Sequence, residues 1–79
     1  MNHELLISRR KDAGYTQQQM AVLLGYKDKS SYCLIENGKA PIYLENAKKI
    51  KQILQLNNKD FNKIFFADEV EETQTNKVI

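Results

Sequence analysis

Hydrophobic residues recur every three or four positions along most of this chain, with polar residues between them. The cleanest example is the series Leu44, Ala47, Ile50 and Leu54. Such spacing puts side chains on one face of an α-helix, and no segment shows the strict alternation that is typical of strands. The pattern therefore predicts an all-α fold of five helices, at about residues 2–13, 16–24, 29–36, 42–54 and 59–66.

Each of the other four helices also has a face that we expect to point inward. The residues on these faces are Leu6, Arg10 and Ala13 in the first helix, Met20, Ala21, Leu23 and Leu24 in the second, Tyr32 and Ile35 in the third, and Phe61, Ile64 and Phe65 in the fifth. Together the five faces predict one small core, as fits a chain of 79 residues, which has room for a single domain.

Capping residues set the boundaries of the two short central helices. Thr16 followed three residues later by Gln19 forms a capping box, and Gly25 ends that helix as a C′ glycine does. Asp28 can cap the next helix, where its charge also suits the positive end of the dipole, and Asn37-Gly38 can end it. The sequence thus predicts two short helices joined by a glycine turn, with most of the second helix free to face a ligand.

Three groups of residues in this region resemble the helix-turn-helix regulators of the phage Cro and repressor type, also called the xenobiotic-response-element family. They are Gly14-Tyr15-Thr16-Gln17, the pair Ala21 and Gly25, and Ile35-Glu36-Asn37-Gly38-Lys39. The similarity extends over roughly residues 5–66 through Arg10, Pro41, Leu44, Ala47 and Ile50. The resemblance implies a compact five-helix, lambda-repressor-like DNA-binding domain with a helix-turn-helix.

One departure from the family pattern lies in the turn. Gly25 and Glu36 are eleven positions apart, one more than in most members of the family. We expect Tyr26 to fill the turn as an apolar plug, Lys27 to be the inserted residue and Asp28 to cap the helix that follows. This assignment puts Lys29 at the first position of the third helix.

The resemblance implies that the third helix lies in the major groove of DNA and that its N-terminal turn reads bases. The implied base-reading residues are Lys29, Ser30, Ser31 and Leu34. Lys29 can donate to guanine O6 and N7, a serine hydroxyl can donate or accept, and Leu34 can contact a thymine methyl group. The alternative for Lys29 is an ordinary solvated lysine near a helix start.

Phosphate contacts are implied on both sides of this helix. Exposed backbone N–H groups at the start of the second helix form a natural anion site, and Gln17 lies there. Asn37 and Lys39 occupy the family's second phosphate clamp, while Lys27 and Tyr43 are further candidates. The alternative for Asn37 is that, with Gly38, it simply ends the helix, and one residue pair can do both.

The resemblance also pairs Arg10 of the first helix with Glu36 at the end of the third. Such a pair is structural, because a bidentate bond between guanidinium and carboxylate would orient the third helix against the rest of the domain.

Charge is distributed unevenly along the chain. Residues 1–66 contain eleven basic and six acidic residues, whereas residues 67–79 contain four acidic residues and one lysine. A basic domain gains affinity for DNA by releasing counterions from the phosphates. For residues 67–79 we expect a mobile acidic tail. The alternatives are that Val70, Val78 and Ile79 add to a dimer contact, or that the acids mimic phosphates and compete for the basic face.

Several classes of function lack the residues they need. Cys33 is the only cysteine, so neither an internal disulfide nor a zinc site made of cysteines can form. It is either a tolerated small side chain or a redox sensor beside the nucleic acid. With His3 as the only histidine and no catalytic set or phosphate-binding glycine loop, we expect no enzyme, metal, cofactor or small-molecule ligand. With neither a signal peptide nor a membrane span, we expect a cytoplasmic protein.

Two functions therefore compete. The first is a sequence-specific transcriptional regulator, a repressor of phage or mobile-element type, that binds a palindromic operator as a homodimer through Phe61, Phe65, Phe66 and Val70. The second is a protein-interaction adaptor, antitoxin-like or anti-repressor, that keeps the fold but grips a protein with its fifth helix and acidic tail.

Overall fold

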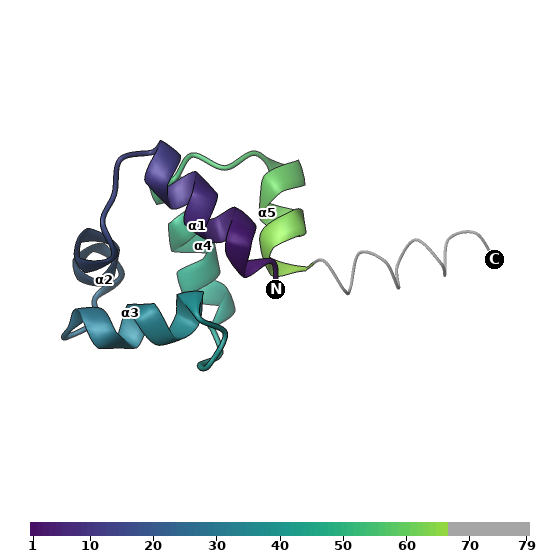
Figure 1. Ribbon diagram of the computed structural model, residues 1–79. Helices are drawn as coiled ribbons and strands as arrows, with labels where there is room; N and C mark the ends of the chain where they lie inside the picture. The colour runs from purple at the N-terminus through teal and green to yellow at the C-terminus, as the bar shows by residue number, and fades with distance from the viewer. Residues whose placement is uncertain (67–79) are drawn as a thin grey trace.

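Residues 1–66 form five α-helices that follow one another and are joined by loops (Figure 1). The computed structural model describes residues 1–66, in which the helices are α1 (His3–Asp12), α2 (Gln17–Leu24), α3 (Lys29–Glu36), α4 (Leu44–Ile53) and α5 (Asn58–Phe65). Each begins and ends within two residues of its predicted bounds, and these 66 residues contain no strand. The prediction of an all-α, five-helix fold is confirmed. The expected acidic tail, residues 67–79 with Val70, Val78 and Ile79, lies outside the described residues.

Side-chain caps explain where four of the five helices begin. Thr16 Oγ1 accepts from the Gln19 backbone N–H at 3.1 Å and Gln19 Oε1 accepts from that of Thr16 at 2.9 Å, so the predicted capping box is present. Asn2, Asp28 and Asn57 each accept from the backbone N–H three residues further on, at the starts of α1, α3 and α5. These local bonds satisfy N–H groups that a helix start would otherwise leave unpaired.

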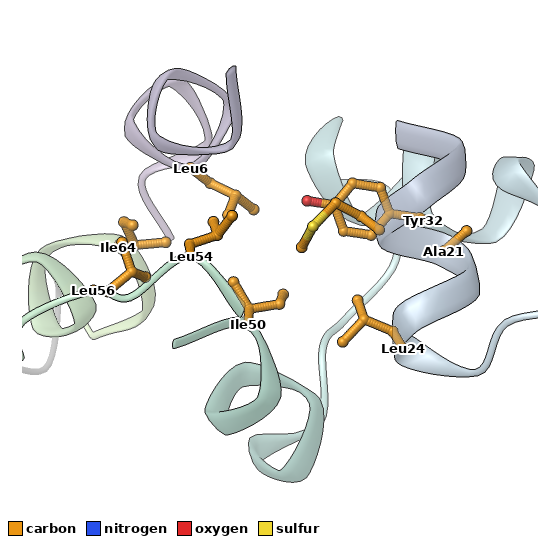
Figure 2. Close-up of a cluster of buried hydrophobic side chains, with 9 residues drawn as sticks. Leu6, Ala21, Leu24, Tyr32, Ile50, Leu54, Leu56 and Ile64 are labelled. Atoms are coloured by element: carbon orange, nitrogen blue, oxygen red, sulfur yellow. The ribbon is translucent and has the colours of Figure 1, made fainter. Parts of the chain in front are cut away.

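The hydrophobic core draws side chains from all five helices, and Figure 2 shows how they converge. Its buried members are Leu6, Met20, Ala21, Leu24, Tyr32, Ile50, Leu54, Leu56 and Ile64. α2 and α3 lie at one side of the molecule and α5 at the other, with α1 and α4 between them (Figure 1). The Asn2 N–H donates to the Ile64 carbonyl oxygen at 2.7 Å and thereby ties the start of α1 to the end of α5.

Three residues that were predicted to face inward are exposed instead. Ala13 follows the last turn of α1, Leu23 is 50% exposed and Leu44 is 54% exposed. Leu23 lies outside the face that Met20, Ala21 and Leu24 define, because adjacent residues of a helix point about 100° apart around its axis. Leu44 is the first residue of α4, one turn before the first buried position. Periodicity alone identified these faces correctly but made them too wide and too long.

Candidate nucleic-acid interface

The turn between α2 and α3 is held by one glycine and one tyrosine. Gly25 has φ +85°, a left-handed conformation that suits glycine and ends α2. Tyr26 follows, packs against the core, and its hydroxyl accepts from Asn46 Nδ2 at 2.8 Å. The longer turn is thus fastened to α4, and the prediction that Tyr26 fills it is confirmed.

The start of α3 is fixed by Asp28. Its Oδ1 accepts from the Ser31 backbone N–H at 3.1 Å and from the Ser31 hydroxyl at 3.4 Å. Lys27 is exposed before this cap and Lys29 is the first residue of α3, as predicted. α3 therefore begins at Lys29, directly after its cap.

The predicted base-reading residues do not all have the same surroundings. Lys29 and Ser30 are exposed, and the Leu34 side chain is 44% exposed although it is apolar. Ser31 is half-buried, and its hydroxyl is turned back to the capping Asp28. Lys29, Ser30 and Leu34 thus face outward for a ligand, whereas Ser31 already serves the helix start.

Behind this surface, α3 is held by a buried ion pair. Arg10 Nε lies 2.6 Å from Glu36 Oε2, Arg10 Nη2 donates to Glu36 Oε1 at 3.3 Å, and the two side chains are 8% and 1% exposed. Arg10 Nη1 also donates to the Tyr15 carbonyl oxygen at 2.8 Å. The arginine therefore joins α1, the start of α2 and the end of α3 in the bidentate arrangement that was predicted.

The carboxyl group of Glu36 remains ionised in this setting. Burial by itself would raise its pKa, but hydrogen bonds from Arg10 and Gln17 and the arginine charge outweigh burial and hold the pKa below its ordinary value. Tyr32 lies fully buried nearby, and burial, reinforced by the Glu36 carboxylate, raises the pKa of its hydroxyl far above the ordinary value. Within residues 1–66 that hydroxyl has no hydrogen-bond partner.

Gln17 has a different role in the structure from the one expected. Its Nε2 donates to Glu36 Oε1 at 2.9 Å, and its Oε1 accepts from the Cys33 thiol at 3.0 Å. The side chain predicted to contact phosphate thus also connects the start of α2 to the last turn of α3. Sequence reasoning did not find the bond to Cys33, because nothing in the chain's spacing signals it.

A hollow lies in front of the N-terminus of α2. It has a volume of about 530 Å³ and is lined by Arg10, Lys11, Gly14, Tyr15, Thr16, Gln17, Gln18 and Lys29. The first N–H groups of a helix lack intrahelical acceptors and attract anions. Lys11 and Lys29 add two ammonium groups to this site. Sequence analysis named Lys29 and Gln17 but missed Lys11 and Gln18, although Lys11 in the last turn of α1 precedes the predicted anion site by only a few residues.

The other predicted phosphate ligands lie along the loop after α3. Asn37, Lys39 and Tyr43 are all exposed there. Gly38 has φ +75°, and a Cβ atom at this position would lie 2.7 Å from His3 Nε2. His3, for which the sequence suggested no role, therefore packs against this loop. Glycine is favoured at position 38 by its positive φ, because the His3 imidazole is the end of a flexible side chain and could move away from an added Cβ atom.

None of the lysines in residues 1–66 is paired with a carboxylate of the same residues. Within residues 1–66 the three ion pairs are Arg9–Asp12, Arg9–Asp60 and Arg10–Glu36, and none involves a lysine. Lysines without carboxylate partners are available to phosphate groups. No set of three or more metal-ligating side chains occurs in the described part of the chain. None of the five helices has the length and hydrophobicity that crossing a membrane requires.

Comparison with known families supports the assignment of α2 and α3 as a helix-turn-helix. A family model described as helix-turn-helix matches residues 6–57, which include α2, α3 and α4 completely. No curated protein and no solved structure was found to match the chain.

Proposed function

The chain belongs to the helix-turn-helix family of the Cro and repressor type, whose members are DNA-binding transcriptional regulators, and we propose that it is a repressor of phage or mobile-element type that places α3 in the major groove of its operator. The observation that carries this proposal is the exposed N-terminal turn of α3, which is braced from behind by a buried ion pair. We place its action in the cytoplasm.

Base reading is assigned to the outward residues of α3. Lys29 donates to guanine O6 and N7, Ser30 donates to or accepts from a neighbouring base edge, and Leu34 contacts a thymine methyl group. Ser31 has a smaller part, because its hydroxyl already bonds to Asp28. A good base contact discriminates against the wrong base by about 1–3 kcal/mol, so a reading head this short recognises few base pairs per half-site.

Two phosphate contacts position this helix. The first is the hollow at the start of α2, where backbone N–H groups together with Lys11 and Lys29 receive one phosphate. Because the Gln17 amide is used internally, Gln17 contributes mainly its backbone N–H group there. The second is the loop after α3, where Asn37, Lys39 and Tyr43 meet the backbone on the other side of the groove, with Lys27 at the turn.

Two copies of the chain bind one palindromic operator. We assign the dimer contact to the end of α5 around Phe65 and Phe66, because three half-buried aromatic rings meet there. The ring centroids of Phe61 and Phe65 are 5.2 Å apart, and those of Phe61 and Phe66 are 5.6 Å apart. In such a dimer the two copies of α3 lie about 34 Å apart, one turn of the duplex.

Selection of bound duplexes from a random pool tests this function. We expect a palindrome whose half-sites are one helical turn apart. On that operator, Lys29→Ala is expected to weaken binding by about 1–3 kcal/mol and to relax the preference at one base pair, whereas Lys59→Ala, which removes an exposed lysine of α5, changes affinity little. Binding must also weaken steeply with salt. Failure to enrich any sequence would favour the adaptor function instead.

A further inference from the structure

A second concentration of lysines lies on α4 and α5, on residues that the proposed DNA contacts do not use. A groove of about 460 Å³ is lined there by Lys48, Lys51 and Gln52 of α4, by Leu56 and by Phe61 of α5. Lys51 Nζ donates to Asn58 Oδ1 at 2.6 Å and lies 5.3 Å from the centroid of the Phe61 ring. One ammonium group is therefore held in place at the groove.

The groove has an apolar floor and is flanked by two lysines whose charges are not neutralised by residues 1–66. The half-buried Phe61 ring supplies most of the apolar floor, and Leu56, which is 7% exposed, lines its base. Neither Lys48 nor Lys51 has a carboxylate partner within residues 1–66. The chemistry that fits such a groove is a short acidic segment that also carries an aliphatic side chain.

The chain itself contains such a segment close to the groove. Residues 68–72 read Asp-Glu-Val-Glu-Glu, four acids around one valine. They begin two residues after Phe66, whose ring meets the Phe61 ring with centroids 5.6 Å apart. Because each residue of extended chain spans about 3.3–3.6 Å, the few residues after Phe66 are long enough to enter the groove.

We propose that residues 68–72 of the same chain dock in the groove between α4 and α5. Val70 covers the floor formed by Leu56 and Phe61, and the flanking acids pair with Lys48 and Lys51. The consequence is that the lysines of α4 are neutralised, so that phosphate binding is confined to the surface around α3. The inference does not depend on which operator the protein reads or on whether it is a repressor.

Amide NMR spectra of the full-length chain test the docking. The variant Asp68→Asn/Glu69→Gln/Glu71→Gln/Glu72→Gln removes the charges without shortening the chain. We expect the backbone amides of Lys48, Lys51 and Phe61 to shift relative to the unaltered protein, and the difference to vanish in high salt, which screens exposed charge pairs. Shifts confined to residues 67–79 would overturn the proposal. Shifts at Lys29 and Ser30 would also overturn it, because they would place the acids on the DNA-binding face.

A pair of charge reversals tests the groove from the other side. Lys48→Glu/Lys51→Glu should release residues 68–72, seen as a loss of heteronuclear NOE at their amides. The matched control Lys59→Glu/Lys63→Glu reverses two exposed lysines of α5 that do not line the groove and should leave the NOE unchanged. An equal loss of NOE in both variants would mean that residues 68–72 are attracted to positive charge in general, and would reject docking in the groove. Shifts at Lys48 and Lys51 that disappear on dilution would assign the groove to a second copy and reject docking within one chain.

The same variants give a functional readout that separates this inference from the proposed function. With its acids neutralised, the protein should bind a duplex of random sequence severalfold more tightly at low salt, because the lysines of α4 become available to phosphate. Adding Lys48→Ala/Lys51→Ala should cancel that gain. Should the gain persist in the combined variant, the docking is refuted even if operator binding is intact.

Discussion

The two sides of this molecule use charged residues in opposite ways. Around α3, an arginine and a glutamate are buried together and bonded to Gln17, whereas along α4 and α5 the lysines stay at the surface without acidic partners. The orientation of α3, the proposed reading helix, therefore depends on a few directional bonds as well as on the packing of Tyr32 and Ile35, while the far side depends mainly on side chains such as Ile64, which packs without direction. The surface that we propose to contact DNA is therefore the one that directional hydrogen bonds hold in place.

The largest effect is expected for Arg10→Ala. It leaves the Glu36 carboxylate buried and without its main partner, at a cost of about 3–5 kcal/mol in the free energy of unfolding. Urea denaturation measures this cost, and affinity for the operator, measured where the variant is folded, should fall less.

Arg9→Ala is the matched control. The Arg9 side chain is 38% exposed, and its pairs with Asp12 and Asp60 are expected to contribute no more than about 1 kcal/mol. Equal stability of the two variants would contradict the contrast between buried and surface charges.

Acid should weaken the same ion pair reversibly. The pKa of Glu36 is lower in the folded protein than in the unfolded chain, so the folded state binds fewer protons and its stability rises with pH through this range. The contribution is complete above the ordinary pKa of glutamate, about 4.3, and is lost as pH falls from there through the folded value. Chemical denaturation at a series of acidic pH values checks this, and Glu36→Gln should flatten the dependence. If the stability of Glu36→Gln depended on pH as strongly as that of the unaltered protein, other carboxyl groups would be responsible for the dependence.

A smaller loss is expected for Gly25→Ala in the turn. No atom would lie within 4 Å of the added Cβ atom, so the cost comes only from forcing φ +85° on alanine, about 1–2 kcal/mol. Thermal unfolding measures it. Gly38→Ala should cost about as much, because its φ of +75° imposes the same strain, while the His3 imidazole, 2.7 Å from the new Cβ atom, is the end of a flexible side chain and can move aside. A clearly larger loss for Gly38→Ala would show that His3 is held rigidly against the loop.

The smallest effect is expected at Cys33. Cys33→Ala removes the thiol that donates to Gln17 and should cost about 0.5–1.5 kcal/mol, whereas Cys33→Ser keeps a donor at that position and should cost less. Hydrogen exchange of the α3 amides is the more sensitive measurement, because the bond connects α3 to the start of α2. Identical exchange in both variants would show that the thiol does not brace the helix.

Features of the fold that depend on neighbouring residues in the chain could be predicted from the sequence. The caps at Thr16 and Asp28 and the glycine that ends α2 were predicted correctly, because each acts within one helical turn. Leu23 and Leu44 were misplaced, because periodicity locates the centre of a buried face but not its edges, which neighbouring helices decide.

The contacts of the candidate interface differ in whether they could be predicted from the sequence. The pairing of Arg10 with Glu36 came from resemblance to a family, since no local pattern connects residues 26 positions apart. Two other sets of contacts could not be predicted, because they arise only where separate helices bring side chains together. They are the bonds of Gln17 to Glu36 and Cys33, and the approach of His3 to Gly38. The roles assigned to Lys29, Ser30 and Leu34 stay predictions until a bound duplex is characterised.

The first three residues make contacts that matter for how the protein is produced. The Asn2 N–H is bonded to the Ile64 carbonyl oxygen, His3 covers the glycine of the loop after α3, and Met1 packs against the core. Residues fused ahead of Met1 for purification would lie next to these contacts. Assays are therefore better run after such residues have been cleaved off.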